Sequence, residues 1–240
     1  MRTIFIKVYF VMSNINIKAL NNMVKFKIAC CLCLFFSLVS IISGQEPIKT
    51  NLSLDNLHPV NRTLTTSNDS KGTPIVHIKG QPNPGIAWIK NSSFKNGYIE
   101  FDVRGKDLLQ QSFVGIAFHG INDTTYEAVY FRPFNFYATD PIRKKHAVQY
   151  IALPTNDWPY LRAEFSDKYE APITSVIDPN DWFHVKLLVV GQMIKIYFNS
   201  DPVPALEVQS LHGKFDGKVG FWTGHTSDGD FKNLTITAKN

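Results

Sequence analysis

Cysteine is absent from most of this 240-residue chain. All three cysteines, Cys30, Cys31 and Cys33, lie in one apolar stretch near the N-terminus, which we expect to be removed from the mature protein. A mature chain without cysteine has neither disulfide bonds nor thiolate metal ligands. Its fold must then be held together by side-chain packing and strand pairing.

Acidic residues are missing from the first 44 positions, whereas five basic residues lie there. The whole chain has 25 Lys and Arg against 20 Asp and Glu, so removing those five leaves 20 against 20 and a formal charge of zero. Proteins that bind nucleic acid are expected to carry a basic stripe. The sequence shows none, and we expect no nucleic-acid partner.

An apolar run long enough for a typical transmembrane helix, about 20 residues, is also missing. Residues 28–43 form a shorter run that follows Lys25 and Lys27 and ends before Gly44, the pattern of a secretory signal peptide. Met23 offers a better start to this leader than Met1. An uncleaved membrane anchor is the alternative.

Three regions therefore follow from the sequence. We predict a leader in residues 1–44, an irregular tail rich in Asn, Ser and Thr in residues 45–72, and one domain in residues 73–240. The mature protein is expected to be secreted, periplasmic or displayed on the cell surface, with no membrane partner after cleavage.

Helical periodicity is lacking in the predicted domain, where apolar residues recur with a period of two. Ile99, Phe101 and Val103 alternate with polar neighbours, and similar segments continue to the C-terminus. Turn signals such as Asn96-Gly97 separate these segments. Many short strands joined by turns predict an all-β antiparallel β-sandwich or jelly roll.

Three stretches, residues 94–103, 114–133 and 181–199, resemble the concanavalin A-like lectin/glucanase superfamily, including laminin-G-like and 3-keto-disaccharide hydrolase-like domains. With a closing segment at residues 229–236, the resemblance covers about residues 74–238. It implies a concanavalin A-like jelly roll. The superfamily contains lectins, hydrolases, lyases and adhesion modules, so the resemblance does not select one activity.

Glu100 and Asp102 share one face of a predicted strand. Retaining glucanases of the superfamily place their carboxylates on one strand as E-x-D-x-E, but Arg104 stands where the second glutamate would be. A retaining hydrolase needs two carboxyl groups about 5 Å apart, so another strand would have to supply one. The alternative is that Glu100 and Asp102 are solvated surface residues.

An enzyme would draw its acid and base from Glu100 and from the polar segment that begins after residue 118. His119, Glu127 and Glu100 are the candidate catalytic residues, with Arg132 steadying negative charge. Glu127 is predicted to point to the opposite strand face from its aromatic neighbours.

Sugar sites combine a flat aromatic ring with planar polar groups that bind hydroxyls. Tyr126, Tyr130 and Arg132 share one strand face. If they converge on the concave sheet with residues further along the chain, they form a glycan site. The predicted ligand-binding residues are Tyr126, Tyr130, Arg132, Asn135, Gln149, Trp158 and Arg162. The alternative is that the aromatic residues only pack and that Arg132 pairs with a carboxylate.

A calcium site is a weaker prediction, carried by Asp228 and Asp230 around Gly229. No cofactor is required by the sequence, and its scattered histidines lack the paired spacing of a catalytic zinc site.

Three functions remain open. We expect a secreted, lectin-like protein that binds a glycan or oligosaccharide on the concave sheet. The first alternative is a glycoside hydrolase or lyase, and the second is an adhesion or protein-interaction module.

Overall fold

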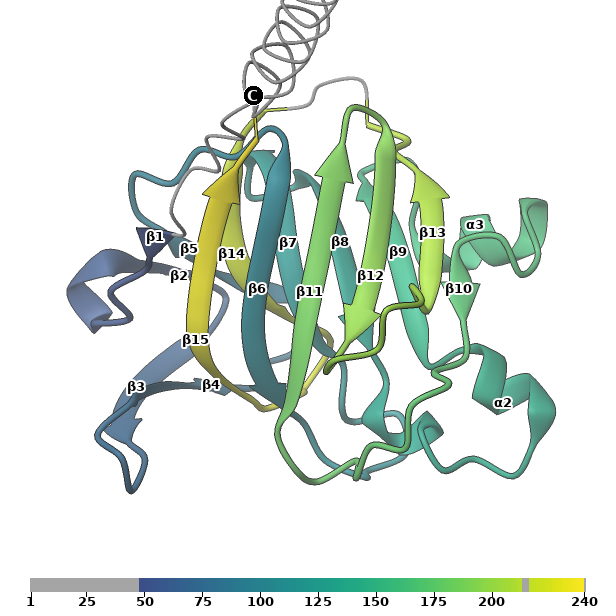
Figure 1. Cartoon of the computed structure of the whole chain (residues 1–240), viewed down its shortest axis with the longest axis horizontal. Coiled ribbons are helices and arrows are strands. Elements are labelled where there is room, and N and C mark those ends of the chain that lie inside the picture. The colour runs from purple at the N-terminus through teal and green to yellow at the C-terminus, as the bar shows by residue number, and fades with distance from the viewer. Residues whose placement is uncertain (1–47, 213–215, 240) are drawn as a thin grey trace, which may run out of the picture. The chain divides into compact units, whose positions relative to one another are not determined.

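The computed structural model describes residues 48–212 and 216–239. This part of the chain forms two antiparallel β-sheets that lie face to face, with a few short helices (Figure 1). The predicted all-β sandwich is confirmed. The predicted leader in residues 1–44 lies outside the described residues. Within the described part of the chain, no helix has the length and apolar character needed to cross a bilayer.

The first sheet, here called the front sheet, faces the viewer in Figure 1. Its strands run in the order β13 (Leu206–Gln209), β12 (Met193–Phe198), β11 (Phe183–Val190), β6 (Gly97–Arg104), β15 (Gly229–Ala238), β4 (Pro74–Lys79) and β3 (Thr63–Asn68), and β1 (Ile48–Lys49) also pairs with β15.

The second sheet, the back sheet, lies behind it. Its order is β10 (Glu170–Ala171), β9 (Val148–Leu153), β8 (Thr125–Phe131), β7 (Val114–Asn122), β14 (Lys218–Thr223), β5 (Gly85–Ile89) and β2 (Leu57–Val60). Within residues 48–212 and 216–239, four short helical segments join the strands: η1 (Leu54–Asn56), η2 (Pro133–Asn135), α2 (Pro141–Lys145) and α3 (Trp158–Glu164). Figure 1 shows α2 and α3 on the same side of the molecule, beside β10.

Alternating side chains build the core between the sheets. Ile99, Phe101 and Val103 of β6 are fully buried, while their polar neighbours face outward. The ring of Phe101 meets Phe221 of the back sheet, with centroids 6.2 Å apart. The period-two pattern therefore places one face of each strand in a shared apolar interior.

The segment predicted as an irregular tail contains two edge strands, which corrects that part of the prediction. β2 extends the back sheet and β3 extends the front sheet, so the chain passes between the two sheets at residues 61–62. β3 is almost entirely exposed and polar, and it therefore lacks the apolar alternation that marks a half-buried strand.

Candidate functional site

A cavity of about 670 Å³ opens on the outer face of the back sheet. Strands β8, β9 and β14 form its floor, and η2, α2, α3 and the loop before β7 form its rim. The structure brings together five of the seven predicted ligand-binding residues in its lining: Tyr130, Arg132, Asn135, Trp158 and Arg162.

The floor is an aromatic platform made by Tyr130 of β8 and Trp222 of β14. Their rings are stacked, with centroids 4.7 Å apart and an interplanar angle of 27°. Between them runs β7, where Gly115 pairs with both residues. A Cβ at Gly115 would lie only 2.1 Å from the carbonyl oxygen of Val129, so glycine is required for this close approach. The missing side chain lets the two rings meet across β7.

Tyr126 and Gln149, the other two predicted ligand-binding residues, support the platform without lining the cavity. The Tyr126 hydroxyl accepts a hydrogen bond from Nε1 of Trp222 at 3.1 Å. The side-chain oxygen of Gln149 accepts one from Arg132 at 3.3 Å. Burial raises the pKa values of Tyr126 and Tyr130 to about 12, so both phenols are protonated at neutral pH.

Arg132 follows β8 and places its guanidinium beside the platform, with only 6% of the residue exposed. Its Nη1 donates to the His146 carbonyl oxygen at 2.8 Å, and its Nη2 donates to the Tyr130 hydroxyl at 2.9 Å. The guanidinium carbon lies 4.9 Å from the centroid of the Tyr130 ring. Burial lowers the pKa of Arg132, although an arginine remains cationic in a protein.

Helix α3 brings Trp158 and Arg162 to the rim. Asp157 caps the helix and accepts a hydrogen bond from the Trp158 amide, and residues four apart share a helix face. The Arg162 guanidinium consequently lies 4.9 Å from the Trp158 ring centroid. It also binds both oxygens of Glu170, at 3.0 and 2.7 Å.

His146 completes this side of the cavity. Its Nδ1 lies 2.7 Å from Oε2 of Glu170, although the pair does not have hydrogen-bond geometry. Burial lowers the pKa of His146, and the nearby Glu170 carboxylate offsets this in part. The imidazole is therefore neutral at pH 7.

Helix α2 contributes Arg143, which reaches back over η2. Its Nε donates to the Asn135 side-chain oxygen at 3.2 Å, and its Nη2 donates to the Phe134 carbonyl oxygen at 2.8 Å. These two bonds hold Asn135 against the rim and leave Arg143 facing the cavity.

The three predicted catalytic residues do not meet in this cavity. His119 and Glu127 are fully buried between the sheets, with Nδ1 and Oε2 2.5 Å apart. Nε2 of His119 lies 3.0 Å from the Lys95 carbonyl oxygen, and the Tyr150 hydroxyl donates to Glu127. This closed network has the character of a polar core cluster. Glu127 does point away from Tyr126 and Tyr130, as the strand alternation predicts.

His119, the first residue of the polar segment after residue 118, belongs to β7. A β-bulge lies between Phe118 and Asn122, and His119 has a positive φ of 51°. The bulge turns two successive side chains, Phe118 and His119, into the core.

Glu100 lies on the opposite side of the molecule, on the outer face of the front sheet. Its carboxylate is 3.8 Å from His184 and 3.9 Å from Lys186. Asp102 beside it accepts hydrogen bonds from His184 at 2.8 Å and from Asn233 at 2.6 Å. Burial opposes the ionisation of Asp102, but these two bonds lower its pKa. Glu100 and Asp102 thus belong to a half-buried surface network of paired charges.

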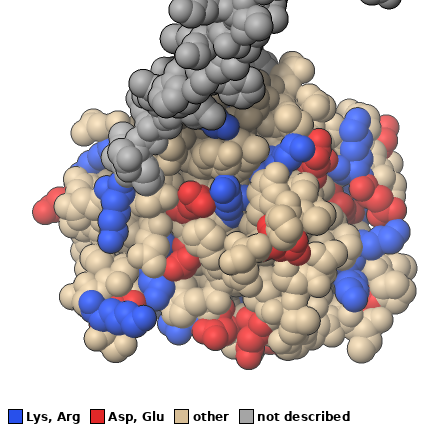
Figure 2. Space-filling model, viewed as in Figure 1, with Lys and Arg blue, Asp and Glu red and all other residues tan. Residues whose placement is uncertain are grey.

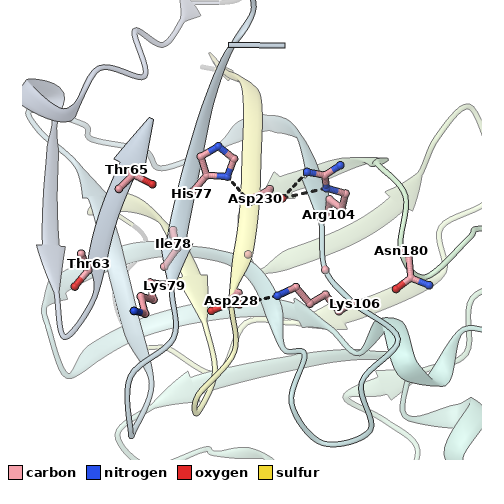
Figure 3. A pocket seen from close by; sticks show the side chains of 12 residues that line it. Thr63, Thr65, His77, Ile78, Lys79, Arg104, Lys106, Asn180, Asp228 and Asp230 are labelled. Carbon is pink, nitrogen blue, oxygen red and sulfur yellow. Dashed lines mark hydrogen bonds and ion pairs between the residues drawn. The ribbon is translucent and has the colours of Figure 1, made fainter. Parts of the chain in front are cut away.

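A second hollow, of about 580 Å³, lies on the front sheet and contains both aspartates of the predicted calcium site (Figure 3). Asp228 accepts a hydrogen bond from Lys106 at 2.6 Å. Figure 3 shows His77 and Arg104 approaching Asp230 from its two sides, at 2.6 and 2.7 Å. A calcium ion would have to displace Lys106, His77 and Arg104 from these carboxylates. Within the described residues, no group of three His, Cys, Asp or Glu side chains is arranged to hold a metal.

Several lining residues were not predicted from the sequence, namely Phe113, Phe134, Arg143, His146, Asp157 and Trp222. A usable signal existed for the two helices. Asp140 precedes Pro141, and Asp157 precedes Trp158-Pro159, so each pairs a capping aspartate with a proline in the first turn. Trp222 carried no local signal beyond its place in a strand.

No family model and no curated protein sequence matches this chain. Its fold is similar to that of a β-glucanase from Bacillus licheniformis, with a TM-score of 0.51, 12% identity, and coverage of 83% of this chain and 100% of the glucanase. For a family 16 endo-glucanase from Bacteroides ovatus, the TM-score is 0.52 at 10% identity, with 79% and 98% covered.

A Bacillus subtilis protein described as having a galectin-like fold gives a TM-score of 0.51 at 13% identity, with 80% of this chain and 94% of that protein covered. These likenesses establish the architecture. The chain has the concanavalin A-like jelly-roll fold, as the sequence resemblance predicted.

Proposed function

We propose that this protein is secreted and binds a carbohydrate in the cavity of the back sheet. The observation that carries the proposal is a cavity of about 670 Å³ whose lining combines aromatic rings, among them the exposed Trp158, with planar polar side chains. An aromatic face packs against the apolar face of a sugar ring, and nearby planar groups bind its hydroxyls. Asn135 and Arg162 are such groups at the rim. The similarity in fold to two glucanases is consistent with a ligand of this class.

The lining of the cavity has too few carboxylates for hydrolysis, which favours binding alone. Canonical glycosidases use two carboxyl groups that flank the scissile bond. Asp157 is the one carboxylate among the described lining residues, and it caps α3. Glu170 lies behind the lining, where Arg162 binds both of its oxygens.

Cleavage by elimination is a second candidate, carried by His146. A neutral imidazole at the cavity wall is able to accept a proton, and the adjacent Arg132 would stabilise negative charge that develops on the substrate. The binding experiment below therefore includes an analysis of the bound glycan for cleavage products.

The test is a glycan-array screen with the protein from Gln45 onward. The key variant is Trp158→Ala, because this side chain is 41% exposed and its removal leaves the core unchanged. Trp182→Ala is the matched control, since the guanidinium of Arg104 lies 4.9 Å from the Trp182 ring on the front sheet, as that of Arg162 does from Trp158.

We expect Trp158→Ala to weaken binding about tenfold and Trp182→Ala to leave it unchanged. Intact glycan after incubation supports binding alone, whereas cleavage that His146→Gln abolishes supports the second candidate. If the array shows no ligand, or if the two tryptophan variants behave alike, the proposed site is wrong.

A further inference from the structure

The cavity of the back sheet carries more cations than anions. Its described lining contains three arginines and one aspartate, and burial lowers the pKa of His146 beside them. The arginines come from three different segments, since Arg132 follows β8, Arg143 lies in α2 and Arg162 lies in α3. A positive potential is thus concentrated at one end of an aromatic floor.

Two of these arginines lack a carboxylate partner among the described residues. Arg132 donates only to the His146 carbonyl, the Tyr130 hydroxyl and the Gln149 amide oxygen. A guanidinium has five N–H donors, so two donors of Arg132 remain for a ligand. Arg143 likewise donates only to neutral oxygens.

On the front sheet, by contrast, arginine and lysine side chains are paired with carboxylates. In the hollow of Figure 3, Arg104 binds Asp230 and Lys106 binds Asp228. Burying an unpaired charge is costly, and Arg132 is far more buried than Arg104. An arginine that is buried and lacks a counter-ion at the wall of a cavity indicates that the counter-ion arrives with the ligand.

The position of the guanidinium specifies where that charge must be. Its carbon lies 4.9 Å from the centroid of Tyr130 and 5.8 Å from that of Phe113. The charged group of a ligand bound to Arg132 would therefore lie beside Tyr130 and Phe113. The two remaining donors, on Nε and Nη1, lie on different edges of the guanidinium, so each can give one charge-assisted hydrogen bond to a carboxylate or a sulfate ester.

We infer that the cavity selects an anionic sugar residue, whose carboxylate or sulfate binds Arg132. The inference rests on the proposed carbohydrate site and specifies its ligand class. The two sources of the anion, a uronic acid and a sulfated sugar, share the same recognition chemistry and are separated by the experiment.

The experiment uses an array of acidic glycans together with their neutralised counterparts, namely methyl esters of uronic acids and desulfated forms of sulfated sugars. We expect an acidic glycan to bind at least about tenfold more tightly than its neutralised form. Loss of binding on esterification identifies a carboxylate as the anion that is recognised. Loss of binding on desulfation identifies a sulfate.

Variants connect this preference to the arginines. Arg132→Gln and Arg143→Gln should each reduce the preference for the acidic form. Arg104→Gln removes the same charge from the front sheet and should leave this preference unchanged. Since Arg132 is buried, thermal unfolding of each variant is measured first, and the half-exposed Arg143 provides the test if Arg132→Gln does not fold.

The outcomes separate the two proposals. A glycan that binds equally well in acidic and neutral forms overturns the anionic specificity and leaves the carbohydrate site standing. An array without any ligand overturns the carbohydrate site itself.

Discussion

At the scale of a single residue, the surroundings of Glu127 indicate a structural role and not a catalytic one. It is fully buried and bonded to His119 and Tyr150. Because the Lys95 carbonyl can only accept, Nε2 of His119 donates to it. The pair lies inside the core, on the opposite face of β8 from the cavity floor.

We expect Glu127→Ala to lower the free energy of unfolding by about 3–5 kcal/mol, since removal of one partner leaves buried polar groups unpaired. Glu127→Gln keeps the shape of the side chain and should cost less. Urea unfolding measures both effects. In the folded protein, neither change should alter glycan affinity, and a well-folded Glu127→Gln variant without binding or cleavage would show that Glu127 is functional.

Residue types and strand alternation were sufficient to predict part of the site. They placed Tyr130 and Arg132 together on the outer face of β8 and Glu127 on the inner face. They failed at His119, where the bulge in β7 inverts the side chain. A bulge depends on how two strands pair, and a single strand's sequence does not record that pairing.

At the scale of elements, the crossing from β2 to β3 depends on Arg62. The residue is 7% exposed, and its guanidinium donates to Thr223 Oγ1 at 2.6 Å and to the carbonyl oxygens of Thr223 and Gly224 at 2.7 and 2.9 Å. Burial lowers its pKa to about 10. Arg62 thereby ties both edge strands to the end of β14, next to the cavity.

Arg62→Ala should lower the free energy of unfolding by about 2–4 kcal/mol, because it removes several charge-assisted hydrogen bonds in a buried place. Denaturant unfolding provides the measurement. The control is Lys71→Ala in the exposed turn between β3 and β4, which should have little effect. Equal stability of the two variants would mean that the crossing does not need Arg62.

The elements themselves were predictable in proportion to their apolar alternation. The strands from β6 to β9 and from β11 to β15 follow the period-two segments of the sequence closely. β2 and β3 were missed because edge strands bury few side chains. Helices α2 and α3 are only five and seven residues long, which is too short for a helical period to emerge.

For the molecule as a whole, the outer faces of the two sheets differ in whether their charged side chains are paired. Lysines, arginines and carboxylates are interspersed over the front face (Figure 2). Glu100, Asp228 and Asp230 each have a lysine or arginine partner there, and Asp102 accepts a hydrogen bond from His184. The cavity of the back sheet instead leaves two arginines without a carboxylate among the described residues. This contrast predicts that one face is inert and the other is the binding face.

The two faces also carry histidines that respond to pH in opposite ways. The hydrogen bond that His184 donates to Asp102 raises the pKa of His184, so the stability it contributes is complete below about pH 6.5 and is lost as the pH rises through the raised value. Burial lowers the pKa of His146, so its contribution is complete above about pH 6.5 and is lost as the pH falls toward the lowered value.

Urea unfolding from about pH 5 to about pH 8.5 tests both signs, because histidines titrate in this window. His184→Gln should flatten the alkaline side of the stability profile, and His146→Gln should flatten the acid side. Profiles of the two variants that remain parallel to that of the unchanged protein would contradict this assignment.

Gly115 limits which parts of the cavity can change in sequence. The floor of the cavity depends on a backbone approach that leaves no room for a Cβ, so substitutions there disturb the pairing of β7 with β8. The rim consists of short helices and loops, which tolerate sequence change far better than strands. Related proteins with this fold are therefore expected to differ first in α2 and α3 and to keep the aromatic floor.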